Sequence, residues 1–308
     1  MTYTIYFRIK ILRILSFLWE IFPVNSFKDF LLLIANKIAS QDFIYQFTSK
    51  DGPIVTLSLP EDISWIKYAL SREYEKCSIL FLKKFALNFP GTYIDVGSNI
   101  GWFSLCMLYS NEDNIVHSFE PQSRIYDRLV KNISINNFSD RIVANKVGLS
   151  SGFSDKKNIY NMPNDPHGHA FVEFKEGAEV IDIIELWSMD YYIDKEKIRD
   201  LKFIKIDVEG HELDVIKGSL NSIQSWSPVI MFEAKINGRI TNRFYEIFNL
   251  VTSINGNYKL YKIPEFKGKI IEVKNLDSRC NLEDELLNYT NLLFVSNKYL
   301  PHLTSWFK

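Results

Sequence analysis

The sequence predicts an α/β fold in which a doubly wound, mostly parallel sheet carries helices on both faces. Short apolar runs alternate with helical stretches from residue 92 onwards, and such runs are typical of strands that a parallel sheet buries on both faces. A turn with two glycines directly follows the first of these runs. The composition, 46% hydrophobic and 24% charged, is that of an ordinary globular protein.

The apolar runs locate the expected strands at residues 55–59, 92–96, 115–119, 142–147, 203–207, 229–233, 258–263 and 292–296. Helices are expected at residues 61–70, 74–87, 100–109, 123–136 and 211–226. Ser123 is the expected N-cap of its helix, because a serine hydroxyl can accept a hydrogen bond from the first turn. Residues 149–180 have weak periodicity and several glycines and prolines, so an irregular insertion or lid is expected there.

Residues 1–70 are expected to form a helical cap segment that precedes a catalytic domain over residues 71–308. Apolar residues recur at helical spacing from Ile11 to Leu18, and residues 30–38 predict a second helix. Such helices either cover the core or form a homodimer contact, and the alternative is peripheral contact with a membrane surface. Glu20 interrupts the apolar run and no small-residue cleavage site follows, so neither a signal peptide nor a membrane span is expected. We therefore expect a cytoplasmic protein, with a membrane-peripheral location as the alternative.

Charge and cysteine content exclude several other classes of protein. The formal net charge is -1, whereas a nucleic-acid-binding protein normally presents a basic face to the phosphates. The three cysteines, Cys77, Cys106 and Cys280, have no CxxC spacing, and the histidines are scattered. We therefore expect reduced thiols, no zinc cluster and no nucleic-acid partner.

The first motif, Asp-Val-Gly-Ser-Asn-Ile-Gly at residues 95–101, follows the first strand of the main sheet. Ligands of open α/β sheets bind beyond the carboxyl ends of the strands. Gly97 lets the backbone turn tightly near a ligand, and Gly101 allows close packing at the start of the next helix. Ser98 and Asn99 lie between these glycines and are expected to line the same site, together with Asp95.

Glu120 ends the next strand, 25 residues after Asp95. A carboxylate at this point can accept hydrogen bonds from both hydroxyls of a ribose. The negative charge of Asp95 suits the ammonium group of a methionine moiety. A dinucleotide site would need G-x-G-x-x-G, but Asn99 stands where the middle glycine belongs, and no P-loop sequence occurs. The motif thus favours an adenosyl cofactor without phosphates over a nicotinamide cofactor.

The second motif, Phe-Ile-Lys-Ile-Asp-Val-Glu-Gly-His-Glu, occupies residues 203–212. Alternation along the strand places Lys205 and Asp207 on one face and Ile204 and Ile206 on the other. A lysine and an aspartate beside a buried strand need partners or a function. This segment is therefore the expected catalytic end of the site.

At this point the sequence resembles the FkbM family of methyltransferases across about residues 74–235. The matching segments are residues 93–101, 119–121, 147–150, 204–212 and 232–233. The resemblance implies a seven-stranded class I methyltransferase (Rossmann-like) sheet with an antiparallel edge and S-adenosylmethionine as the methyl donor. It also implies a hydroxyl acceptor, on a sugar or a polyketide-type metabolite.

Two details qualify the resemblance. Ser98 replaces the alanine that the family usually has in the glycine motif, which should not affect cofactor binding. Residues 188–190 resemble the family's Thr-Leu-Asp before the fourth strand of the core.

Methyl transfer to a hydroxyl requires a group that accepts the hydroxyl proton. His211 is the candidate general base because imidazole titrates near neutrality, and Asp207 or Glu209 would orient it. Asp207 is the alternative base, and a polar helix cap formed by Glu209 and His211 is the structural alternative. No metal is expected, although Asp207, Glu209 and His211 could hold a divalent cation. Glu233, at the end of the fifth strand of the core, faces either the acceptor or the interior.

These observations predict an S-adenosylmethionine-dependent O-methyltransferase that acts on a sugar or glycan. A small secondary metabolite is the alternative acceptor. A non-catalytic module that binds the cofactor or serves as a scaffold is the second alternative. Intact Asp95, Glu120 and Asp207 argue against that module, because an inactive copy has no reason to keep all three.

Overall fold

The computed structural model describes residues 3–22, 24–38, 43–48, 54–59, 63–71, 74–163, 170–235, 242–254, 256–264, 269–273, 289–303 and 305–306. The thiols of Cys77 and Cys106 are free, whereas Cys280 lies outside the described residues. None of the helices in this part of the chain combines the length and hydrophobicity that a bilayer-crossing segment needs.

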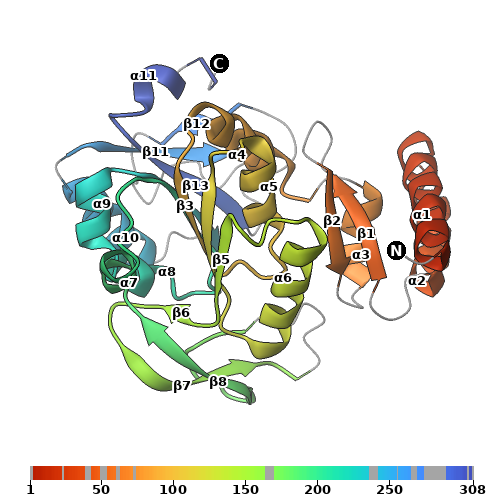
Figure 1. Ribbon diagram of the computed structural model, residues 1–308, viewed down its shortest axis with the longest axis horizontal. Coiled ribbons are helices and arrows are strands. Elements are labelled where there is room, and N and C mark those ends of the chain that lie inside the picture. The colour runs from red at the N-terminus through yellow and green to blue at the C-terminus, as the bar shows by residue number, and fades with distance from the viewer. Residues whose placement is uncertain are drawn as a thin grey trace.

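The main sheet has eight strands in the order β12-β11-β13-β10-β9-β3-β4-β5 (Figure 1). Its parallel strands are β3 (Thr92–Val96), β4 (Ile115–Phe119), β5 (Ile142–Asn145), β9 (Leu201–Ile206) and β10 (Val229–Lys235). The antiparallel edge consists of β13 (Tyr289–Ser296), β11 (Tyr258–Ile263) and the short β12 (Ile271–Glu272). The doubly wound α/β fold is confirmed. The sheet exceeds the expected seven strands because β12 extends its edge.

Helices cover both faces of this sheet, and alternate strand residues pack against them. One face carries α4 (Lys76–Asn88), α5 (Trp102–Ser110) and α6 (Ser123–Ile135). The other carries α7 (Met189–Lys195), α8 (Glu212–Lys217), α9 (Leu220–Trp226) and α10 (Asn242–Ser253). Tyr93 and Phe203 are buried on the first face, and Ile94 and Ile204 on the second. Successive strand residues point to opposite faces, so these runs read as continuously apolar.

Residues 148–187 contain a second, three-stranded sheet in the order β6-β8-β7, at the bottom of Figure 1. Its strands are β6 (Gly148–Leu149), β7 (Ser154–Asn161) and β8 (Glu179–Trp187). The expected irregular insertion over 149–180 is therefore wrong for β7 and the start of β8, and residues 164–169 lie outside the described part. Most of β7 is polar and exposed, so the strand gives no apolar alternation; Ile159 packs into a small core with Ile184 and Leu186.

The N-terminal segment lies beside the main sheet, at the right of Figure 1. It contains α1 (Tyr3–Ile21), α2 (Asn25–Ile38), the antiparallel pair β1 (Phe43–Thr48) and β2 (Ile54–Leu59), and α3 (Ile63–Ser71). Two asparagines fix it to the main sheet domain: Asn132 of α6 accepts a hydrogen bond from the Ser58 N–H, and Asn136, directly after α6, accepts one from the Thr56 N–H. The expected helices are present, strand β1 was not predicted, and the division between residues 70 and 71 stays a prediction.

Two local predictions need correction. Gln122, not Ser123, occupies the N-cap position of α6, and the backbone N–H of Ser123 donates to Asp182 of β8 instead. The helix expected over 211–226 is two helices, α8 and α9, interrupted at Gly218. A β-carbon at this glycine would lie 2.0 Å from the carbonyl oxygen of Ser150. Gly218 ends α8, and Ser150, which follows β6, leaves no room for a side chain there.

Candidate functional site

The loop after β3 joins three strand ends through its backbone. The N–H groups of Gly97 and Ser98 donate to the carbonyl oxygen of Phe119 at the end of β4, each at 3.0 Å. On the other side, the N–H of Asp207 donates to Val96. Gly97 has a φ of 73°, and a β-carbon there would lie 1.8 Å from the carbonyl oxygen of Asp207. The two motifs that the sequence predicts separately are thus in backbone contact, and glycine is required where they meet.

Glu120 holds this loop from the adjacent strand end. Its Oε2 accepts the N–H of Asn99 at 3.0 Å, and its Oε1 accepts the N–H of Gln122 at 3.0 Å. Asn99 adopts a φ of 49°, which turns its N–H toward the carboxylate. Burial raises the pKa of Glu120 to about 7, although the two N–H donors act in the opposite direction. Each carboxylate oxygen keeps a lone pair, so the group can also accept hydrogen bonds from a ligand.

Asp95 lies beneath the loop and is completely buried. The hydroxyl of Ser104 on α5 donates to its Oδ2 at 2.6 Å and lies 2.7 Å from the hydroxyl of Ser118. Lys205 lies 3.8 Å from the other carboxylate oxygen. Burial raises the pKa of Asp95, while Lys205 and Ser104 partly offset that rise. The expected contact with a ligand ammonium group stays a prediction, because the structure gives Asp95 these interior partners.

Lys205 bridges two carboxylates on the α5 face of β9. Its Nζ lies 3.1 Å from Asp207 as well as 3.8 Å from Asp95, and it stands 4.5 Å from the ring centre of Phe103. Burial acts to lower the pKa of Lys205, but Asp207 and Asp95 outweigh it and raise that pKa. The predicted alternation is confirmed, since Ile204 packs into the opposite core.

Three acidic side chains meet beyond Lys205. Asp207, Glu209 and Glu233 can place one carboxylate oxygen each within 4.8 Å of one another. Burial raises the pKa of Glu233 to about 9, and the nearby charges of Asp207, Glu209 and Glu75 act in the same direction. These carboxylates therefore repel each other, and a cation or a shared proton would stabilise them. We call this group the carboxylate cluster.

His211 does not belong to the carboxylate cluster. Its Nε2 is 3.0 Å from the hydroxyl of Ser150, and its Nδ1 is 3.6 Å from Asp214 on α8. Burial lowers its pKa, and Asp214 acts against that change. The expected orientation of this imidazole by Asp207 or Glu209 is therefore wrong, and the carboxylates group with Glu233 instead. The backbone turns between Asp207 and His211, where Glu209 and Gly210 have φ values of 51° and 96°.

Sequence reasoning missed several neighbours of the site. The hydroxyl of Ser104 was not considered, although a serine nine residues after Asp95 on the following helix faces back toward the strand. Asn291 of β13 was also missed; it pairs opposite Glu233 and donates to Glu75 and to Ser78. No local pattern marks Asn291, because only the antiparallel pairing of β13 places it there.

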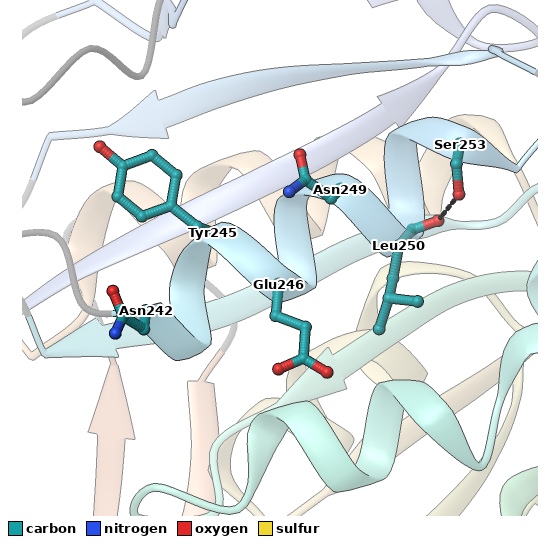
Figure 2. Close-up of a pocket in the computed structure, with 6 residues that line it drawn as sticks. All are labelled: Asn242, Tyr245, Glu246, Asn249, Leu250 and Ser253. Atoms are coloured by element: carbon teal, nitrogen blue, oxygen red, sulfur yellow. Dashed lines mark hydrogen bonds between the residues drawn. The ribbon is translucent and has the colours of Figure 1, made fainter.

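A surface hollow lies along α10 (Figure 2). Its lining consists of Asn242, Tyr245, Glu246, Asn249, Leu250 and Ser253. All of them belong to this one helix, and Figure 2 shows Asn242, Tyr245 and Glu246 directed outward from it. The hollow contains no residue of the strand-end site, so it does not define the functional site.

The strand order and the glycine loop after β3 are those of a class I methyltransferase, with β13 inserted antiparallel between β10 and β11. The chain belongs to the FkbM methyltransferase family. The model of the methyltransferase FkbM domain matches residues 95–260, just over half of the 308 residues, from the glycine motif through β10 to β11.

Two named relatives are similar to part of the chain. Hexuronic acid methyltransferase AglP of Haloferax volcanii is 33% identical over 138 residues, 44% of this chain and 53% of that protein. Methyltransferase sdnD of Sordaria araneosa is 28% identical over 152 residues, 41% of this chain and 59% of that protein. The match thus spans little more than half the length of either relative. A methyltransferase FkbM structure from Methylobacillus flagellatus KT is 15% identical, with a TM-score of 0.42 over 75% of this chain and 53% of that one.

Proposed function

We propose that the protein transfers a methyl group from S-adenosylmethionine to a hydroxyl group of a sugar or glycan. The observation that carries the proposal is that the glycine loop after β3 and the carboxylate cluster meet at one edge of the main sheet. The loop held by Glu120 suits a nucleoside, and it is in backbone contact with Asp207 of the carboxylate cluster. The likeness to AglP, a hexuronic acid methyltransferase, supports a saccharide acceptor.

The residues of the loop suit S-adenosylmethionine. Glu120 offers carboxylate lone pairs to the two ribose hydroxyls, while Gly97, Ser98, Asn99 and Gly101 bring backbone close to the ligand. No phosphate has to be neutralised, which agrees with a buried carboxylate at Asp95 rather than a cation. When bound, this cofactor supplies a methyl group on a positively charged sulfur.

The carboxylate cluster supplies the remaining chemistry. Bound S-adenosylmethionine would supply the methyl group, and its sulfur would keep the electron pair of the broken carbon–sulfur bond, so this chain has to orient the acceptor hydroxyl and take up its proton. The hydroxyl proton then passes to a carboxylate, for which Asp207 is the candidate because it is one-third exposed and is held by Lys205. Glu233 and Glu209 orient the acceptor. His211 stays the alternative base.

The experiment begins with calorimetry using S-adenosylmethionine, S-adenosylhomocysteine and NADH. Binding of the two adenosyl ligands but not NADH is expected, and the reverse result would overturn the proposal. Transfer of a labelled methyl group is then assayed with hexuronic acid saccharides. We expect Asp207→Asn to lower turnover at least about a hundredfold with cofactor affinity retained. Loss of turnover in His211→Ala but not in Asp207→Asn would assign the base to His211 instead.

A further inference from the structure

Helix α1 buries one side and exposes an apolar stripe on the other. Leu12, Leu15 and Trp19 are at most 9% exposed and pack into the core. Ile14, Phe17 and Ile21 follow one another at helical spacing on the opposite side, and each is between 49% and 58% exposed. A surface helix of a globular protein normally places charged or polar residues on that side.

Helix α2 continues this surface. It packs beside α1, both helices pack against α3, and the pair stands outermost from the sheet in Figure 1. Each of the two helices thus has a side turned away from α3. Phe30 and Leu33 are 54% and 60% exposed, and Phe22 in the connection is 45% exposed. With Val24, which is 58% exposed in the same connection, seven residues form what we call the apolar outer face: Ile14, Phe17, Ile21, Phe22, Val24, Phe30 and Leu33.

Basic residues accompany this face. Residues 1–38 contain five basic residues (Arg8, Lys10, Arg13, Lys28 and Lys37) and two acidic ones (Glu20 and Asp29), whereas the whole chain has 36 basic and 37 acidic residues. Lys10 and Arg13 are exposed on α1, on the same side as the apolar stripe. Residues 1–38 therefore carry a net charge of +3 in a chain whose formal net charge is -1, with Glu20 and Asp29 exposed on the same two helices.

We propose that the apolar outer face binds the surface of an anionic membrane, with α1 and α2 lying in the plane of the headgroups. The apolar side chains enter the boundary between headgroups and acyl chains, while the basic residues meet anionic lipid. This arrangement needs no membrane-spanning helix. A second copy of the chain fits less well, because a symmetric contact would bring the same basic residues together in a dry interface. The proposal does not depend on the acceptor of the methyl group.

Sedimentation of the full chain with lipid vesicles tests the proposal. Vesicles of phosphatidylcholine with phosphatidylglycerol should bind the protein, and phosphatidylcholine alone should bind it much more weakly. The double variant Phe17→Ser/Leu33→Ser should bind at least about tenfold more weakly. Lys10→Gln/Arg13→Gln should weaken binding about fivefold for each charge removed, and added salt should act in the same direction.

A matched control removes exposed apolar residues elsewhere. Phe153→Ser/Ile183→Ser changes side chains that are 71% and 62% exposed near the second sheet, and it should leave vesicle binding unchanged. Circular dichroism melting checks that every variant folds. No sedimentation with anionic vesicles would overturn the proposal. A second copy of the chain would be the occupant instead if light scattering showed a concentration-dependent dimer, Phe17→Ser/Leu33→Ser abolished that dimer, and the protein did not bind vesicles. That result would also overturn the proposal. Equal binding to neutral vesicles would overturn the role of charge.

Discussion

The α-carbon of Gly97 lies against the carbonyl oxygen of Asp207, so closely that a β-carbon would stand 1.8 Å from that oxygen. This contact joins the loop after β3 to the loop after β9. It brings the glycine motif and the carboxylate cluster to one edge of the sheet. Neither motif alone indicates how close the two loops are, because the distance depends on the pairing of β3 with β9.

Gly97→Ala is expected to destabilise the protein by about 3 kcal/mol or more. The added methyl group collides with backbone rather than a flexible side chain, and the φ of 73° is itself unfavourable for alanine. Urea unfolding gives the free energy. Gly152→Ala is the matched control, because nothing lies within 4 Å of its added β-carbon, and a change within about 0.5 kcal/mol is expected. Equal effects of the two variants would contradict the close approach.

Cofactor affinity should depend on pH through Glu120. The carboxylate must be ionised to accept hydrogen bonds from both ribose hydroxyls, and burial raises its pKa to about 7. Affinity for S-adenosylhomocysteine should therefore level off above pH 7 and fall up to about tenfold for each pH unit below it. Calorimetry across this range measures the effect.

Glu120→Gln provides the control for that pH dependence. Glutamine keeps the shape of the side chain but does not titrate, so the affinity should be weaker than wild type and nearly independent of pH. A variant that kept the wild-type slope would show that another group titrates on binding.

Asp190 should contribute to stability rather than to catalysis. Its carboxylate accepts the N–H groups of Asn221 and Ser222 in the first turn of α9, the latter at 2.8 Å. Asp190→Ala leaves these donors without that acceptor and should cost about 1–2 kcal/mol in thermal or urea unfolding. Asp194→Ala, on the exposed side of α7, should cost less than about 0.5 kcal/mol. Comparable losses would contradict the capping role.

Sequence patterns predicted the buried part of the fold well and the contacts between elements poorly. β3 and β4 begin and end where their apolar runs predict, because the buried strands of a parallel sheet are largely apolar. β11 also has the predicted bounds, although Lys259 is exposed on it. β7 escaped prediction because water, not a core, surrounds most of its side chains. The interruption at Gly218 and the direction of His211 escaped it because both follow from the position of Ser150, more than sixty residues away.

The candidate site likewise contains contacts that the sequence predicts and contacts that it does not. The sequence predicts Lys205 and Asp207 on one face of their strand, and their contact at 3.1 Å confirms it. Glu120 is expected to meet ribose hydroxyls, and its hold on the loop backbone was not predicted. Glu233 joins the cluster through the parallel pairing of β10 with β9. The interior partners of Asp95 could not be predicted, since burial of that carboxylate depends on how α5 packs over β3.

Glu233 should make the stability of the protein fall as pH rises. Its pKa is raised from the ordinary 4.5 to about 9 in the folded protein, so the folded state binds a proton that the unfolded state releases above pH 4.5. The stabilising effect of this proton is complete below pH 4.5 and is lost as pH rises through 9. Glu233→Gln removes the titration, so the free energy of unfolding of the variant relative to wild type should increase steadily between pH 5 and 9. Urea unfolding at several pH values measures this difference, with the exposed Glu176→Gln as the control. For Glu176→Gln, the free energy of unfolding relative to wild type should not change with pH. If the same difference for Glu233→Gln were also independent of pH, then Asp207, Glu209 and Glu233 would not share a proton.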